Sequence, residues 1–178
     1  MMRRLLWLIL FLAAAAALAA FAGLRSYRAF TQEELVAAVE CQAAPPGADH
    51  RFLLRIRPVA RGAPGPEQSF PMQGEQWTLG GDILKWAPWL TALGARPAHK
   101  LTRLESRYLA AEEEATRPRS AYDLNGGTSP IWRWLHRFGP SLPLVDAVYG
   151  NAAYTDARPG GRWGVYVTPS GYLIRPLR

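Results

Sequence analysis

Several features that mark enzymes and metalloproteins are missing from this sequence. Cys41 is its only cysteine, so no disulfide can form within the chain and no cysteine pair can bind zinc. The three histidines, His50, His99 and His136, lie far apart, outside the usual spacings of metal ligands. There is no Gly-x-Ser-x-Gly elbow, phosphate-binding loop or dinucleotide-binding fingerprint. The sequence therefore predicts no metal ion or other cofactor, and it argues against a common hydrolase or nucleotide-dependent enzyme.

Charged and polar side chains are also absent from the stretch between Leu5 and Leu24, which follows the pair Arg3 and Arg4. About 20 such residues, rising 1.5 Å each in a helix, span the hydrocarbon of a bilayer. We therefore predict a membrane anchor in residues 1–28 and one β-rich extracytoplasmic domain in residues 29–178. The small-x-small sequence Ala20–Ala22 leaves a cleaved signal peptide as the alternative, although the apolar run is longer than a typical signal sequence.

The formal net charge of +7 is unevenly distributed along the chain. Arg3 and Arg4, with Arg25 and Arg28 beyond the apolar run, supply four of these charges and leave +3 for the remainder. Because the other arginines alternate with acidic residues, we expect no nucleic acid partner. The two N-terminal arginines and the free amino group outweigh the two that follow the run. The positive-inside rule therefore predicts a cytoplasmic N-terminus and a domain across the membrane.

Two segments have patterns that are open to more than one interpretation. Thr31–Glu34 has the form of a helix capping box, yet apolar residues alternate from Leu35 to Cys41 as they do in a strand. Lys100–Tyr108 alternates charged and apolar residues, and we interpret it as a strand although helical spacing would also align its apolar side chains. The acidic run Glu112–Glu114 is predicted to be a solvated loop, because consecutive side chains do not converge on a cation.

Other segments predict strands more clearly. Arg51–Val59 has the period-two pattern of a half-buried strand, and Gly62–Pro66 suits a hairpin loop. Ser129-Pro130 and Gly139-Pro140 bracket a predicted helix. The remaining β-prone runs are Gln76–Leu79, closed by Gly80-Gly81, then Asp82–Trp86, Val145–Tyr154, Arg162–Thr168 and Tyr172–Ile174. The fold class predicted is α+β, a mainly antiparallel β domain with one or two short helices, preceded by a single N-terminal transmembrane helix.

Four polar residues are candidates for a catalytic site. Asp82 and Lys85 flank an apolar turn, and Asp146 and Tyr149 lie in a run of apolar and small residues. A carboxylate in such surroundings can acquire the shifted proton affinity that catalysis uses. A structural ion pair or a turn cap explains each of them equally well, so both interpretations stay open.

Tryptophan offers a second set of candidates. Trp86 and Trp89 form one cluster and Trp132 and Trp134 another. Indole rings fill cores but also favour the headgroup region of a bilayer. Because neither cluster can easily bury both of its rings, we expect contact with the membrane or with a partner from this set.

Four segments together carry a family resemblance: Gln76–Trp86, Leu101–Tyr108, Val145–Gly150 and Ser170–Arg175. In them the chain resembles a family of small uncharacterised bacterial membrane proteins, often labelled automatically as cation or multidrug efflux pump or multidrug transporter. The resemblance implies a bacterial membrane protein with a short N-terminal membrane region followed by a β-rich domain. Together with the positive-inside rule, it leads us to expect a place in the bacterial inner membrane with the domain in the periplasm. It implies no catalytic residue. One spanning segment without intramembrane charge cannot form a transport pathway by itself.

The sequence therefore predicts a single-pass envelope protein whose domain binds or scaffolds rather than catalyses. Its expected partners are the membrane and envelope or transport proteins, and it would act as an accessory to an efflux or transport system. A homodimer through the small residues of Ala13–Ala20 is a further option. The alternatives are an enzyme of unknown reaction and a lipid-contacting module at the membrane surface.

Overall fold

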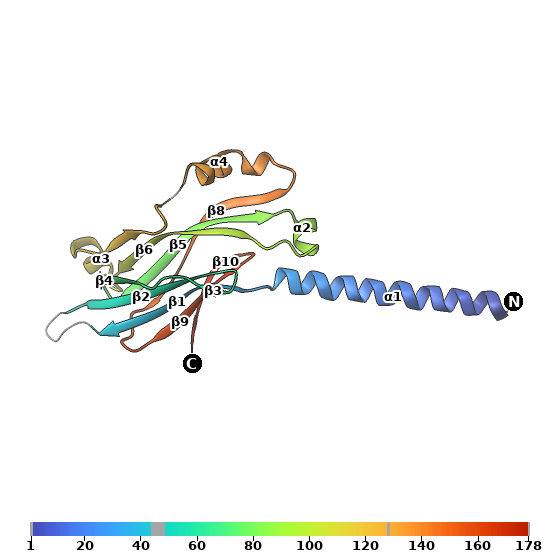
Figure 1. Ribbon diagram of the computed structural model, residues 1–178, viewed down its shortest axis with the longest axis horizontal. Helices are drawn as coiled ribbons and strands as arrows, with labels where there is room; N and C mark the ends of the chain where they lie inside the picture. Colours follow the sequence, from blue (N-terminus) through green and yellow to red (C-terminus); the bar gives the residue numbers. More distant parts are fainter. Residues whose placement is uncertain (1, 44–48, 128, 178) are drawn as a thin grey trace.

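The computed structural model describes residues 2–43, 49–127 and 129–177. Helix α1 (Met2–Phe30) projects away from the rest of the molecule (Figure 1). Its part from Arg3 to Phe30 is long and apolar enough to cross a membrane, and none of its most apolar window is buried in the protein. No other helix in the described part of the chain has this length and composition. The structure thus contains the predicted candidate span at the predicted place.

The first sheet is built from both ends of the domain. Its strands are β1 (Glu34–Ala43), β2 (Arg51–Ala60), β3 (Ala63–Pro64), β4 (Gln68–Gln73), β9 (Arg162–Thr168) and β10 (Gly171–Pro176). They are antiparallel in the order β10-β9-β1-β2, and β3 and β4 both pair with β2. The C-terminal hairpin therefore lies beside β1, the first strand after α1.

The second sheet is formed by the middle of the chain. Its antiparallel order is β7 (Ala121–Asp123), β6 (Ala98–Arg107), β5 (Gln76–Trp86) and β8 (Val145–Asp156). The short helix α2 (Pro88–Ala92) connects β5 to β6, and α3 (Ala111–Thr116) connects β6 to β7. Helix α4 (Pro130–Phe138) continues into the 3-10 turn η1 (Gly139–Ser141) and covers the outer side of this sheet (Figure 1).

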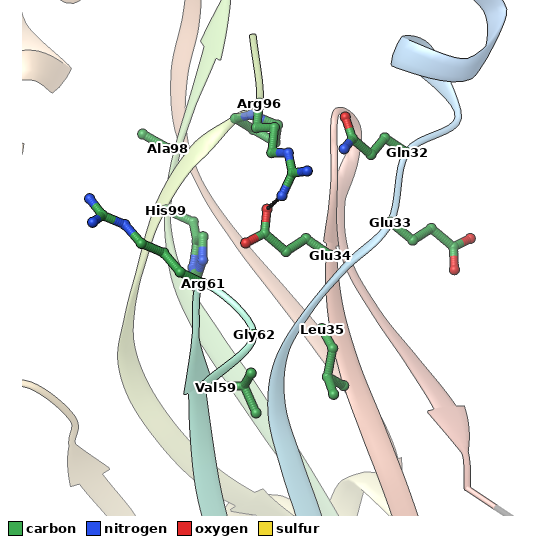
Figure 2. A pocket seen from close by; sticks show the side chains of 11 residues that line it. Gln32, Glu33, Glu34, Leu35, Val59, Arg61, Gly62, Arg96, Ala98 and His99 are labelled. Carbon is green, nitrogen blue, oxygen red and sulfur yellow. Dashed lines mark hydrogen bonds and ion pairs between the residues drawn. The ribbon is translucent and has the colours of Figure 1, made fainter. Parts of the chain in front are cut away.

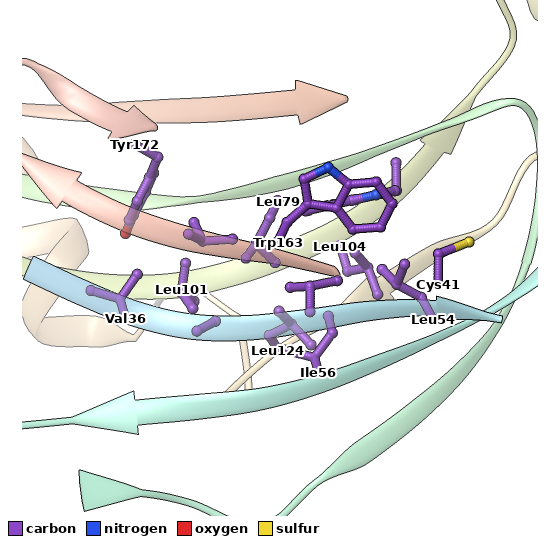
Figure 3. Packing of buried hydrophobic residues seen from close by; sticks show 14 of the residues in the cluster. Val36, Cys41, Leu54, Ile56, Leu79, Leu101, Leu104, Leu124, Trp163 and Tyr172 are labelled. Carbon is purple, nitrogen blue, oxygen red and sulfur yellow. The ribbon is translucent and has the colours of Figure 1, made fainter. Parts of the chain in front are cut away.

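The main core lies between the two sheets (Figure 3). The period-two pattern of β2 places Phe52, Leu54 and Ile56 in it, where each is at most 5% exposed. Trp77 of β5 meets Trp163 of β9 edge-on, with the ring centroids 5.7 Å apart. Since these two rings come from opposite sheets, they join the two layers of a β-sandwich. A smaller cluster of Leu84, Trp132 and Val145 lies between α4 and the second sheet.

The predicted fold class is confirmed, and two local predictions are corrected. Of the two interpretations left open for the segment from Thr31 to Cys41, the strand is confirmed, because α1 ends at Phe30 and strand β1 begins at Glu34. Gly80-Gly81 does not close a strand, because β5 runs through it with a bulge to Trp86. The acidic run Glu112–Glu114 is helical, within α3, and a carboxylate oxygen of Glu114 accepts a hydrogen bond of 2.7 Å from the backbone of Tyr108.

The single thiol is part of the core and should be inert in the folded protein. Cys41 is fully buried, and this burial raises its pKa to about 11. Since the thiolate is the reactive form, we expect iodoacetamide at pH 8 to alkylate folded protein about 100-fold more slowly than protein in concentrated urea. Mass spectrometry of timed samples measures both rates. Equal rates with and without urea would contradict the buried position.

Candidate functional site

Three of the four predicted catalytic candidates lie together. Lys85 Nζ is 2.8 Å from Asp146 Oδ2, and both side chains are about one-third exposed. The hydroxyl of Tyr149 donates to the Pro169 carbonyl at 3.3 Å, and burial raises the pKa of this phenol although Lys85 partly offsets the effect. A hollow of about 440 Å³ beside them is lined by Phe30, Lys85 and Tyr149 among others. The group therefore has a paired cation, a paired carboxylate and a protonated phenol, which suit binding better than proton transfer.

Asp82 lies apart from these three, on the outer face of the second sheet. Its Oδ1 atom is 2.9 Å from Nε2 of His136, and its side chain is 9% exposed. Its second carboxylate oxygen is buried without a hydrogen-bond partner among the described residues. The contact holds α4 on β5, and it does not open into any of the hollows described for this chain. His136 was missed by sequence reasoning, although its helical spacing from Trp132 places it on the buried face of α4.

The tryptophan clusters are each divided between the interior and the surface. Trp132 is 8% exposed beneath α4, whereas Trp134 is 48% exposed. Trp86 is half-buried and donates from its indole nitrogen to the Arg96 carbonyl at 2.8 Å, whereas Trp89 is 53% exposed. One ring of each cluster is therefore free to contact a membrane or a partner.

A hollow of about 930 Å³ opens between the sheets where α1 joins the domain, and it is larger than the other hollows described for this chain. We call it the anchor-end cleft; it is lined by Gln32, Glu33, Glu34, Leu35, Val59, Arg61, Gly62, Arg96, Pro97, Ala98 and His99 (Figure 2). Arg96 reaches Glu34 across it, with Nη1 3.3 Å from Oε2. Sequence reasoning missed this site because its walls come from three segments that are distant in the chain.

No match was found to any known family, curated protein or solved structure. Within the described residues, no group of three or more histidine, cysteine, aspartate or glutamate side chains could hold a metal ion.

His99 lines the anchor-end cleft, and its pKa is shifted by its surroundings. Burial lowers its pKa below the usual value, although the nearby Glu34 carboxylate acts in the opposite direction. Its ring packs edge-on against Tyr172 with the centroids 6.1 Å apart. The imidazole is therefore neutral at pH 7 and offers hydrogen bonds rather than charge to a ligand.

This lowered pKa predicts a pH dependence of stability. Below the ordinary histidine pKa of about 6.5, His99 binds a proton in the unfolded chain but not in the folded protein. The free energy of unfolding is therefore at its full value above that pH and decreases as the pH falls below it. Urea titrations at pH 7.5 and pH 5.5 measure the free energy of unfolding. Between these two pH values it should decrease less for His99→Gln than for the wild type. His50→Gln is the matched control, and an equal loss in all three proteins would refute the assignment.

Helix α4 exposes several large apolar side chains on its outer face. Ile131, Trp134 and Phe138 are 65%, 48% and 44% exposed, respectively. The rings of Trp134 and Phe138 are 5.8 Å apart, and the guanidinium of Arg137 lies 5.3 Å from the centre of the Phe138 ring. Side chains three and four residues apart lie on one side of a helix, so these groups form a single surface, which we call the α4 outer face.

Proposed function

We propose that this chain is a single-pass bacterial envelope protein whose β-sandwich domain binds or scaffolds a protein partner and performs no covalent chemistry. The α4 outer face is the observation that carries the proposal. Helix α4 already packs Trp132 and Leu135 inward, and it still presents Ile131, Trp134 and Phe138 to solvent. A clustered apolar surface with a tryptophan at its centre is typical of a protein contact.

The charges around this surface indicate the chemistry of the partner. Arg133, His136 and Arg137 are the only ionisable residues between Pro130 and Val145, and none of them is acidic. A partner with an apolar groove and acidic residues at its rim complements this surface. An envelope or transport protein in the same membrane is the kind of partner that an anchored accessory subunit would meet.

The polar candidates favour binding over catalysis. Lys85 and Asp146 neutralise each other, and Asp82 is buried against His136 rather than exposed to a substrate. The anchor-end cleft likewise contains the paired Arg96 and Glu34. In none of these places do a nucleophile and a base converge on a free position, which acid–base or covalent catalysis needs.

The topology is tested by fusing alkaline phosphatase after the C-terminal residue. A domain in the periplasm makes the fusion enzyme active, because this reporter folds only outside the cytoplasm, and carbonate washing should leave the chain in the membrane fraction. The same fusion to a cytoplasmic reporter should be inactive. An active cytoplasmic reporter would reverse the orientation, and release of a shortened chain would show that the segment is cleaved.

The partner surface is tested by photo-crosslinking in cells. A photoreactive residue at Ile131 is compared with one at Leu109, which is similarly exposed at 67% but lies between β6 and α3, outside the α4 outer face. We expect a discrete crosslinked product from position 131 only, and its loss when Trp134→Ala is added. Identical products from both positions, or a product that is unaffected by Trp134→Ala, would contradict the proposal.

A further inference from the structure

We propose that the domain touches the bilayer directly through a second attachment, formed by α2 and the segment that follows α4. This membrane foot consists of Trp89, Leu93, Leu142 and Leu144. The inference rests on the proposed role of α1 as the membrane span, and it adds a lipid-binding surface on the domain itself. The partner is the headgroup layer and upper acyl region of the same membrane that holds α1.

A hydrogen bond places α2 at the level of the membrane surface. Arg25 is the first residue after the apolar run that ends at Leu24, and its Nη2 atom donates to the Leu93 carbonyl at 3.2 Å. An arginine at the end of a spanning helix lies in the headgroup region, so Leu93 lies within one side-chain length of that region. Figure 1 accordingly shows α2 beside the end of α1 that enters the domain.

The exposed face of α2 is apolar and points away from the core. Trp89 and Leu93 are 53% and 65% exposed and are four residues apart, whereas Thr91 between them is 3% exposed. The helix therefore turns its polar hydroxyl inward and its large apolar side chains outward. This inversion costs free energy in water but is favourable at a bilayer interface, where tryptophan in particular is enriched.

A second uncharged segment extends this surface. The backbone N–H of Ala87 donates to the Leu144 carbonyl at 2.9 Å, which joins the start of α2 to the segment between η1 and β8. Leu142 and Leu144 are 37% and 47% exposed. Neither Ala87–Ala95 nor Phe138–Val145 contains a charged residue. In Figure 1 both segments turn at the anchor end of the second sheet.

A second contact with the membrane would restrict the orientation of the domain. An anchor alone leaves a domain free to rotate and tilt, whereas an anchor and a foot on one side of it hold the domain at two points. In this position the membrane would cover α2 and leave the α4 outer face turned to the side. A partner in the same membrane could then reach the Trp134 ring.

The experiment uses the full-length chain in vesicles of phosphatidylethanolamine and phosphatidylglycerol. One cysteine is introduced in each of four variants, at Leu93, Leu144, Leu109 or Leu18, and is labelled with the fluorophore NBD. All four leucines are exposed in the protein, so the substitutions leave its core intact. Wild-type protein gives the labelling background, since Cys41 is fully buried. Nitroxide lipids, with the quencher either near the headgroup or deep in the acyl chain, then report the depth of each label.

We expect quenching at positions 93 and 144 by the shallow nitroxide, quenching at position 18 by the deep nitroxide, and none at position 109. A blue-shifted emission should accompany quenching. If position 18 is quenched but positions 93, 144 and 109 are not, the membrane foot is contradicted while the role of α1 as the membrane span is retained. Loss of quenching at position 18 would overturn both the anchor and the foot that depends on it.

Discussion

Replacing Trp77 with alanine is expected to lower the free energy of unfolding by about 3–5 kcal/mol, the range found for large aromatic side chains deleted from cores. Trp77 is fully buried and meets Trp163 of the opposite sheet. Its removal would open a cavity at the point where the two layers of the sandwich are joined. Urea unfolding of the full chain in detergent, followed by far-ultraviolet circular dichroism, measures the change.

Two control variants separate this packing effect from other consequences of losing an indole. The indole nitrogen of Trp77 has no hydrogen-bond partner among the described residues, so Trp77→Phe should cost much less than Trp77→Ala. Trp89→Ala removes the same group from an exposed position and should cost little in detergent. Similar losses for Trp77→Ala and Trp89→Ala would mean that the sandwich core does not depend on this contact.

Gly81→Ala is expected to destabilise the protein by about 3 kcal/mol or more, through overlap rather than through a cavity. A Cβ atom on Gly81 would overlap the Lys100 carbonyl oxygen and would lie 2.8 Å from the Tyr172 hydroxyl. The carbonyl belongs to the backbone of the paired strand β6, so it cannot move without breaking the ladder. Thermal unfolding of the full chain should therefore show a lower midpoint.

Gly150→Ala is the matched control for this prediction. Gly150 lies opposite Asp82 on β8, next to Gly81 in the same sheet, and a Cβ atom there would meet nothing within 4 Å. Its replacement should leave the midpoint unchanged or raise it slightly, because alanine has less conformational freedom to lose. If the two variants unfolded at the same temperature, close packing of β5 against β6 would not be the reason for the glycine.

Strand faces and element ends were predictable because their signals are local. The alternation in β2 predicted which residues are buried, and Ser129-Pro130 and Gly139-Pro140 marked the ends of α4. Strand β4 was missed, since its Pro71 and polar residues give no period-two signal. It is a strand because the exposed edge of β2 offers backbone partners to it.

The candidate sites could not be predicted from local sequence signals, because their residues come from segments that are distant in the chain. The pairing of Asp82 with His136 joins residues 54 positions apart, and the anchor-end cleft brings together the start of β1 and the start of β6. Neither follows from spacing, because each depends on how the layers pack. The sequence indicated that the two tryptophan clusters were too crowded to be buried completely, but it could not indicate which ring is exposed.

The amino-acid sequence alone determined the apolar segment and the antiparallel β character of the domain, because hydrophobicity and period-two alternation act over a few neighbouring residues. Only the tertiary structure decided that Trp77 and Trp132 are buried while Trp89 and Trp134 are exposed. The rotation of α2 and α4 about their axes, relative to the sheet beneath them, makes this choice. That rotation is set by contacts such as His136 with Asp82 and Arg25 with Leu93, between segments that are distant in the chain.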